Sequence, residues 1–174
     1  RFLEGYGPNI SALKSLVSKG SNLIITVDCG INSYEPLKEL NKTNIDCIII
    51  DHHTPDDDLP SAFSIVNPKR KENGIEYHYL CAVGVTFIMI VGLTRELRQR
   101  GVFEKIKEPN LFRFLDLVAL GTVCDVVPLK ALNRCFVKAG LNIISQRKNL
   151  GINALCDISD LNKIPDEETL GYKL

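Results

Sequence analysis

The sequence lacks an excess of charge of either sign, because Lys plus Arg and Asp plus Glu each number 21 among its 174 residues. It therefore has no global positive field to attract nucleic acid, and binding to a polyanion has to use a local patch, a bound cation or another part of the protein. Long hydrophobic runs are missing too. The longest, roughly 81–93, is too short for a membrane span, which needs about 20 residues.

Paired cysteines are also absent. The six cysteines, at 29, 47, 81, 124, 135 and 156, form no C-x-x-C pair. Most lie in apolar runs, where a free cysteine behaves as a small buried hydrophobe, so we expect reduced thiols and a cytoplasmic protein. No G-x-G-x-x-G stands between a predicted strand and helix, which disfavours a dinucleotide-binding Rossmann domain.

The first half of the chain predicts a βαβ unit. Two short, nearly all-apolar runs of the kind buried on both faces of a parallel sheet are separated by a helical segment. In chain order we expect a helix over 10–19 capped by Asn9, a strand over 23–27, a helix from a Ser33 cap to about 41, a strand over 45–50 and a third strand over 62–66.

The second half predicts helices. A segment from 81 to about 100 is apolar up to Leu93 and charged afterwards, as expected of a helix that begins in the core and emerges into water. Further helices are expected at about 110–120, at 132–146 and near Asn153. The fold class is therefore α/β, a parallel sheet with flanking helices in residues 1–80, plus a mainly helical subdomain in residues 81–174.

Ionisable residues stand directly after two of the predicted strands. Asp28 follows "LIITV", and Asp51, His52 and His53 follow "DCIII". Neighbouring parallel strands lie about 4.8 Å apart, so pairing in register brings Asp28 close to His52 at the sheet edge where such folds bind ligands. Carboxylates with imidazoles form a hard, mixed ligand set, which suits manganese or magnesium better than a thiolate zinc site.

Asp125 has a related context in "GTVCDVVPL", an apolar, β-branched run. A carboxylate buried there should be neutralised, hydrogen-bonded or bound to a cation. Structural roles compete with these functions: Asp28 can serve as a turn residue and Asp125 as a capped loop residue. Cys29 and Cys124 follow or precede a key aspartate, and on strands they would point away from it. The acidic run 56–58 is expected to be a solvated turn.

Three stretches, "TVDCGI" at 26–31, "IDHHTP" at 50–55 and "GTVCDVVPL" at 121–129, resemble successive motifs of the DHH phosphoesterase superfamily. Together with "EGYGPN" at 4–9, "NPKR" at 67–70 and "CAVGVTF" at 81–87, they are most similar to its RecJ branch of single-strand-specific DNA exonucleases. The ordered set is far more specific than D-H-H alone.

The resemblance implies roles for individual residues. Asp28, His52 and Asp125 match metal ligands, His53 matches a catalytic histidine that faces the scissile phosphate, and Asp51 would orient the histidines. Two divalent cations, manganese or magnesium, would activate a water and stabilise charge on the attacking and leaving oxygens. The implied substrate is single-stranded DNA, digested from its 5′ end in recombination and repair, with other repair proteins as further partners.

The resemblance also implies that parts of the family pattern lie outside these residues. The first family motif, a D-x-D-G strand end, would precede Arg1, and a substrate-gripping domain would follow Leu174. Asp28, His52 and Asp125 are too few ligands for two cations. We therefore expect the 174-residue chain alone to bind manganese weakly and to be nearly inactive.

Two other functions remain open at this point. A DHH phosphoesterase can act on small substrates such as pyrophosphate, oligoribonucleotides or cyclic dinucleotides, although "GTVCDVVPL" after a long apolar helix favours the exonuclease. A non-catalytic DHH module that only binds partners would tend to lose its metal ligands, and here all of the matched ones are present.

Overall fold

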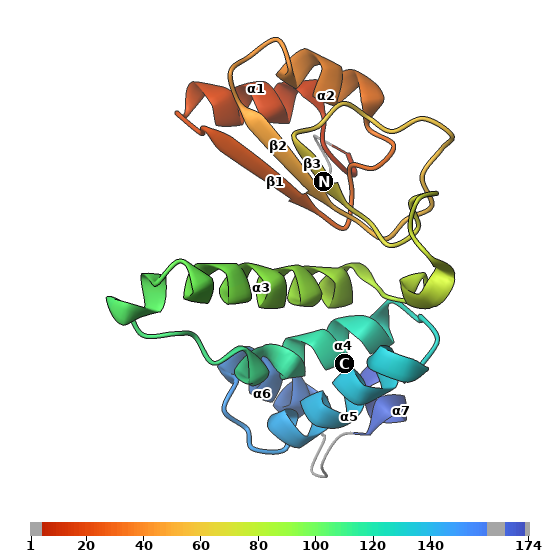
Figure 1. The fold of residues 1–174 in the computed structure, drawn as a ribbon. Coiled ribbons are helices and arrows are strands. Elements are labelled where there is room, and N and C mark those ends of the chain that lie inside the picture. The colour runs from red at the N-terminus through yellow and green to blue at the C-terminus, as the bar shows by residue number, and fades with distance from the viewer. Residues whose placement is uncertain (1–4, 160–165, 173–174) are drawn as a thin grey trace. The chain divides into compact units, whose positions relative to one another are not determined.

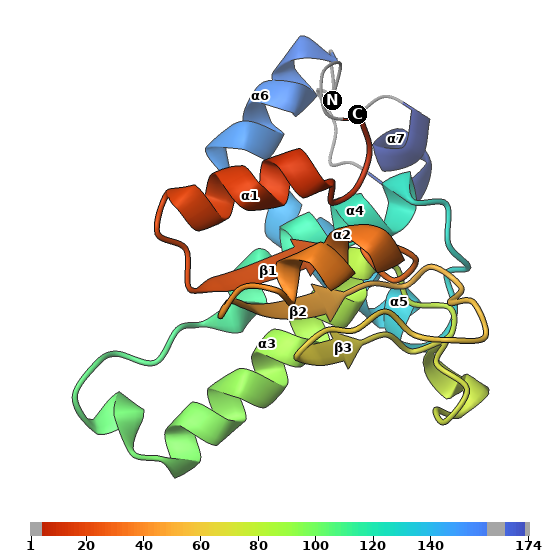
Figure 2. The ribbon, with the colours of Figure 1, turned by 90° about the horizontal axis from the view of Figure 1, so that it is seen from above.

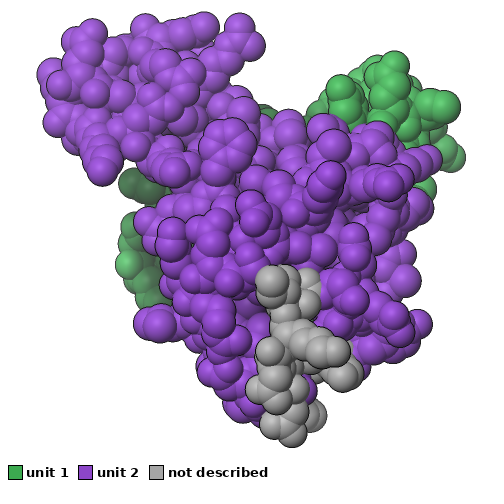
Figure 3. All heavy atoms as spheres, turned by 90° about the horizontal axis from the view of Figure 1, so that it is seen from below, with its two compact units in different colours: residues 1–78 green, residues 79–174 purple. Residues whose placement is uncertain are grey.

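The computed structural model describes residues 5–159 and 166–172. The chain divides into two units, residues 1–78 and 79–174, which are coloured separately in Figure 3. The first unit contains a parallel sheet with flanking helices and the described part of the second is helical. The predicted fold class is therefore confirmed.

The first unit is a three-stranded parallel sheet in the order β1-β2-β3, with two helices over one face (Figures 1 and 2). Its core joins side chains of both helices to those of the two longer strands: Leu13, Leu37 and Leu40 with Ile24, Cys47 and Ile49. The elements are α1 (Ile10–Ser18), β1 (Leu23–Val27), α2 (Tyr34–Leu40), β2 (Asp46–Ile50), β3 (Ser64–Val66) and a 3₁₀ turn at Ile75–Tyr77.

β1 differs from the prediction that it is buried on both faces. Ile24 and Thr26 are buried, and Ile24 packs with side chains of the helices, whereas Leu23, Ile25 and Val27 are 45–50% exposed. The reason is that α1 and α2 pack on one face of the strand and leave the other face uncovered by the described helices of this unit. An all-apolar run cannot reveal this, because it removes the alternation that marks a one-sided strand.

The helix caps of this unit were predicted with mixed success. Asn9 is the N-cap of α1, and its side-chain oxygen accepts a hydrogen bond from the Ala12 N–H at 2.8 Å. Ser33 also stands at the N-cap position of α2, but its side chain makes no capping hydrogen bond, so this part of the prediction was wrong. β3 is shorter than the predicted 62–66, since it begins at Ser64.

The second unit is built from helices around α4 and α5, which make its closest packing. Gly140 of α5 allows this approach, because a Cβ there would lie 2.2 Å from the Leu115 carbonyl oxygen and 2.3 Å from the Ala119 Cβ of α4. The elements are α3 (Ala82–Gln99), a 3₁₀ turn at Val102–Glu104, a second at Leu111–Phe114, α4 (Leu115–Cys124), α5 (Ala131–Ile144), α6 (Leu150–Ile158) and α7 (Glu167–Tyr172).

Two helix predictions need correction here. The segment 110–120 begins as a 3₁₀ turn, and α4 then runs on through Cys124, so "GTVC" is helical and not part of an extended run. α3 begins buried and ends exposed as predicted, but exposure starts near Ile88, which is 43% exposed, and not after Leu93. None of the helices in the described part of the chain is both long and apolar enough to cross a membrane.

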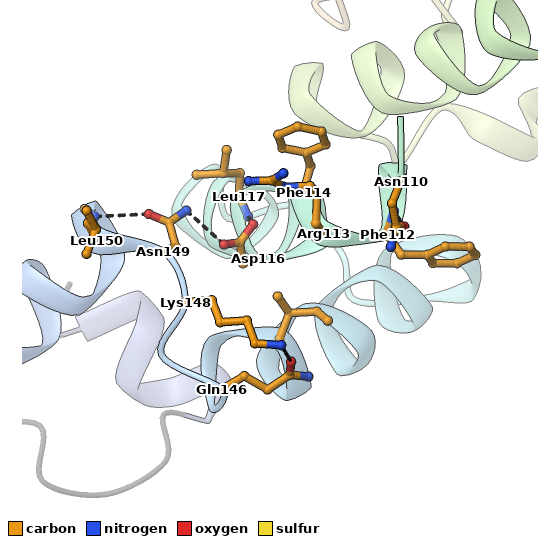
Figure 4. Close-up of a pocket in the computed structure, with 12 residues that line it drawn as sticks. Asn110, Phe112, Arg113, Phe114, Asp116, Leu117, Gln146, Lys148, Asn149 and Leu150 are labelled. Atoms are coloured by element: carbon orange, nitrogen blue, oxygen red, sulfur yellow. Dashed lines mark hydrogen bonds between the residues drawn. The ribbon is translucent and has the colours of Figure 1, made fainter. Parts of the chain in front are cut away.

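The start of α6 is fixed to α4 by a polar contact inside a groove of about 660 Å³ (Figure 4). The Asn149 amide donates to the Asp116 carboxylate at 2.9 Å, while its carbonyl oxygen caps α6 by accepting from the Gly151 and Ile152 N–H groups. Asp116 is only 3% exposed, and the bond from Asn149, together with one from the Leu117 N–H at 2.7 Å, satisfies this buried carboxylate.

Candidate metal centre

The register of the sheet brings the predicted site residues of the first unit together. Val27 of β1 pairs with Ile50 of β2, so the two strands end side by side. The ladder continues past them, because the Asp28 N–H donates to the Ile50 carbonyl at 2.9 Å and the Asp51 N–H to the Val66 carbonyl at 3.0 Å. Asp28 and the D-H-H residues therefore share one edge of the sheet, as the sequence predicted.

Three side chains at this edge can share a cation. His52 Nε2 lies 3.3 Å from Asp28 Oδ1. Asp28, His52 and His53 each offer one ligand atom, and these atoms lie within 4.8 Å of one another, the only such group found among the described residues. One carboxylate and two imidazoles form a mixed oxygen and nitrogen donor set, which fits a hard or borderline divalent cation such as Mn²⁺.

Asp51 lies behind this group and accepts hydrogen bonds from several donors. Its side chain is 1% exposed. Oδ1 accepts from the His52 and His53 N–H groups at 2.7 and 3.2 Å and lies 2.7 Å from His53 Nδ1, while Oδ2 accepts from the Ile31 N–H at 3.0 Å. Burial raises the pKa of Asp51, but the bonds from His53, Ile31 and His52 outweigh it and leave this pKa below its ordinary value.

This arrangement sets the state of the His53 ring. An ionised carboxylate only accepts hydrogen bonds, so the Nδ1 facing Asp51 carries the proton. Nε2 is then the ring nitrogen left for a cation or a phosphate oxygen. The His53 main chain is held as well, because the amide of Asn67, which is 3% exposed, donates to its carbonyl at 2.9 Å. Asn67 was not predicted as a site residue, although its place directly after a strand was a signal.

The backbone of Asp28 adopts an uncommon conformation. Its φ is +62°, in the left-handed region, where a residue with a side chain carries about 1–3 kcal/mol of strain. The Tyr6 hydroxyl donates to the Asp28 carbonyl at 2.6 Å. Sequence reasoning used Tyr6 only as part of a family-like stretch and missed this contact.

A cavity of about 280 Å³ opens beside these residues. It is lined by Tyr6, Gly7, Cys29, Gly30, Ile31, Asn32, Ser33, Asp51 and His53. The prediction that Cys29 points away from the site was wrong, because Asp28 leaves the strand conformation and alternation no longer applies. Burial raises the pKa of the Cys29 thiol, and the carboxylates of Asp51 and Asp28 raise it further, so the thiol stays protonated at neutral pH.

Asp125 belongs to the second unit and differs from its predicted environment. It is exposed and forms the C-cap of α4, so the expectation that its carboxylate is buried in the apolar run was wrong. The strand argument for Cys124 was also wrong, because Cys124 is an exposed residue of α4. The next residue, Val126, has φ +55° and is 88% exposed, a strained conformation for a β-branched residue. That Asp125 joins Asp28 and His52 in one metal site stays a prediction.

Comparisons with known proteins identify the family of the chain. Residues 2–122 match the model of the "DHH family, N-terminal domain". The chain is 40% identical over 163 residues to the "Single-stranded-DNA-specific exonuclease RecJ" of Dickeya dadantii, covering 92% of this chain and 28% of that protein. For the Escherichia coli protein of the same name, the identity is 39% over 179 residues, covering 100% and 31%. The chain thus spans less than a third of these curated relatives.

Solved structures give the same match in three dimensions. A crystal structure of exonuclease RecJ bound to manganese is 29% identical, with a TM-score of 0.80 over 99% of this chain and 41% of that one. RecJ from Thermus thermophilus in complex with Mn²⁺ is 26% identical, with a TM-score of 0.75 over 95% of this chain and 23% of that one.

Proposed function

The chain belongs to the DHH family, and on this basis we propose that it carries metal ligands of a divalent-metal-dependent exonuclease that hydrolyses single-stranded DNA. The observation that carries the proposal is the group formed by Asp28, His52 and His53 at the carboxyl edge of a parallel sheet, with Asp51 buried behind it. Its support from comparison is the set of relatives named single-stranded-DNA-specific exonucleases.

In this proposal the residues have separate tasks. Asp28 and His52 hold a cation, with Asp125 as a further ligand, and the metal is manganese or magnesium. When bound, two such cations supply activation of a water and stabilisation of negative charge at phosphorus. Asp51 keeps the His53 ring in one tautomer, so that Nε2 is presented to a phosphate oxygen. The cavity beside His53 gives the terminal nucleotide a place to lie.

We extend the proposal to the cellular task. Digestion from the 5′ end of single-stranded DNA, in recombination and repair and alongside other repair proteins, is the activity that the family resemblance implies. Six free thiols are consistent with work in the reducing cytoplasm. At zero net charge, attraction of DNA relies on the bound cations and on local basic side chains.

The test uses the natural full-length protein that contains these residues, purified without metal and supplied with Mn²⁺. We expect release of nucleotides from a 5′-labelled single strand and much slower release from the duplex. Asp28→Ala should lose at least about 100-fold, because removal even of a group that only orients a metal ligand costs about 10–100-fold. A matched control is Asp57→Ala, which removes an acid that is exposed and paired with Lys71, and it should keep full activity.

The same assay separates the competing functions. Faster hydrolysis of short oligoribonucleotides or pyrophosphate than of single-stranded DNA would replace the exonuclease by a small-substrate phosphoesterase. Unchanged nuclease activity in the Asp28→Ala protein would refute a catalytic role for this edge of the sheet. Absence of hydrolysis with every substrate, despite normal Mn²⁺ binding, would identify a binding module.

A further inference from the structure

The direction of the Asp28 side chain depends on a backbone conformation that needs support. With φ at +62°, Asp28 turns its Cα–Cβ bond out of the strand geometry of β1, and its Oδ1 lies 3.3 Å from His52 Nε2. A return to an extended φ would swing the carboxylate away from His52. Whatever stabilises the left-handed φ therefore also sets the distance between these two ligands.

Two hydrogen bonds hold the Asp28 main chain, one on each side. Its N–H donates to the Ile50 carbonyl at 2.9 Å, which is the last rung of the β1–β2 ladder. Its carbonyl oxygen accepts from the Tyr6 hydroxyl at 2.6 Å. The first bond would also form if Asp28 were extended, because the position of the N–H does not change with φ. The carbonyl group does move when φ changes, so the second bond favours the observed conformation.

The segment around Tyr6 is shaped to make this contact. Gly5 and Gly7, on either side of Tyr6, have φ values of +79° and +75°, which residues with side chains rarely adopt. A Cβ on Gly7 would lie 3.9 Å from the Cys29 Cβ, so the segment runs close to the residue after Asp28. Tyr6 is 64% exposed, so burial contributes little to its placement. Its hydroxyl ties the side chain to the Asp28 carbonyl.

We propose that Tyr6 is a positioning residue of the metal centre, which holds Asp28 in its left-handed conformation through the hydroxyl and so keeps the carboxylate aimed at His52. The inference rests on the proposed function, because it takes Asp28 to be a metal ligand. A positioning role can be distinguished from a general stabilising role by its effect on metal binding. Loss of the hydroxyl should weaken metal binding without lowering the activity of the fully loaded enzyme.

The experiment compares Tyr6→Phe with the wild-type full-length protein and with Tyr77→Phe, the same change at a half-exposed tyrosine of the same unit. Mn²⁺ affinity is measured from the electron paramagnetic resonance signal of free Mn²⁺, and nuclease activity is measured across a Mn²⁺ titration. For Tyr6→Phe we expect about tenfold weaker binding, as for other groups that orient metal ligands, with normal kcat at saturating Mn²⁺. Tyr77→Phe should match the wild type in both.

The other possible outcomes would refute either the positioning role of Tyr6 or the proposed function. Wild-type Mn²⁺ affinity in Tyr6→Phe overturns the positioning role. The positioning role is also overturned if Tyr6→Phe has wild-type Mn²⁺ affinity while Tyr6→Leu has a raised KM for single-stranded DNA. That result would show that the ring of Tyr6 matters and its hydroxyl does not. Failure of the wild-type protein itself to bind Mn²⁺ refutes the proposed function. This outcome can be told apart from equal Mn²⁺ binding by the wild-type and Tyr6→Phe proteins, which refutes only the role of Tyr6.

Discussion

Asp51→Asn is expected to lower the free energy of unfolding of the first unit strongly, although the two side chains have nearly the same shape. Four groups hydrogen-bond to Asp51 as donors: the N–H groups of Ile31, His52 and His53, and the His53 ring. An amide offers one acceptor oxygen and one donor NH₂ group. If the amide oxygen faces the histidines, the NH₂ group faces the Ile31 N–H, and two donors then meet without an acceptor. In the reverse orientation the NH₂ group faces the donors of His52 and His53, so more donors lose their acceptor.

The size of this effect follows from the buried bonds. Each buried donor left without an acceptor costs about 1–3 kcal/mol, and the remaining bonds lose their charged acceptor. We therefore expect a loss of about 2–4 kcal/mol. Since roughly every 1.4 kcal/mol corresponds to a factor of ten, the slowest amides of β1 and β2 should exchange roughly 30 to 700 times faster.

Amide hydrogen exchange read by mass spectrometry measures this opening locally, in EDTA so that metal binding does not contribute. Asp57→Asn is the matched control, because that side chain is 96% exposed and contacts Lys71 at the surface, so its exchange should equal the wild type. Equal exchange in Asp51→Asn and Asp57→Asn would refute the reasoning that Asp51 holds the D-H-H segment.

Further predictions concern packing, strain and metal. Gly140→Ala should destabilise the second unit by about 3 kcal/mol, because the new Cβ would overlap α4. Gly92→Ala, which has open space around the new Cβ, should instead stabilise α3 by about 0.5–1 kcal/mol. Thermal unfolding of both proteins checks that the two changes in stability have opposite signs. Val126→Gly should relieve the strain at φ +55° and stabilise by about 1 kcal/mol in the same measurement, and a loss of stability would contradict this. EDTA should abolish nuclease activity, and Mn²⁺ at about 100 times its Kd should restore it. The same Mn²⁺ concentration should stabilise the wild-type protein by about 2.7 kcal/mol but should not stabilise the Asp28→Ala protein. Equal stabilisation of the two proteins would argue against Asp28 as a ligand.

The sequence predicted the sheet well because its signals were local and consistent. The runs before Asp28 and Asp51 are β-branched, Asn9 is a strong helix cap, and the two longer strands agree with the predicted ones to within a residue. Pairing of Val27 with Ile50 then placed Asp28 beside His52 by geometry alone. Strand order and register thus account for which residues meet, whereas the direction of the Asp28 carboxylate also depends on its left-handed φ.

The failures arose where tertiary packing overrides local preference. "GTVC" has two β-branched residues, which favour strands, yet it forms the last turn of α4. There Thr122 is wholly buried, with its hydroxyl 3.3 Å from the Cys81 thiol. The left-handed turn at Asp28 and the contact from Tyr6 depend on residues far apart in the sequence. No periodic pattern records such contacts.

The register between β1 and β2 limits how the length of this unit can vary. Asp28 and Asp51 stand one residue past the paired Val27 and Ile50. A deletion of one residue inside β2 would move the following side chains to the opposite face and replace His52 by His53 beside Asp28. A deletion in the exposed loop at 56–58 leaves that pairing intact. Insertions and deletions in natural variants should therefore be found in the loops between the strands, while the spacing from each strand to its acidic residue stays fixed.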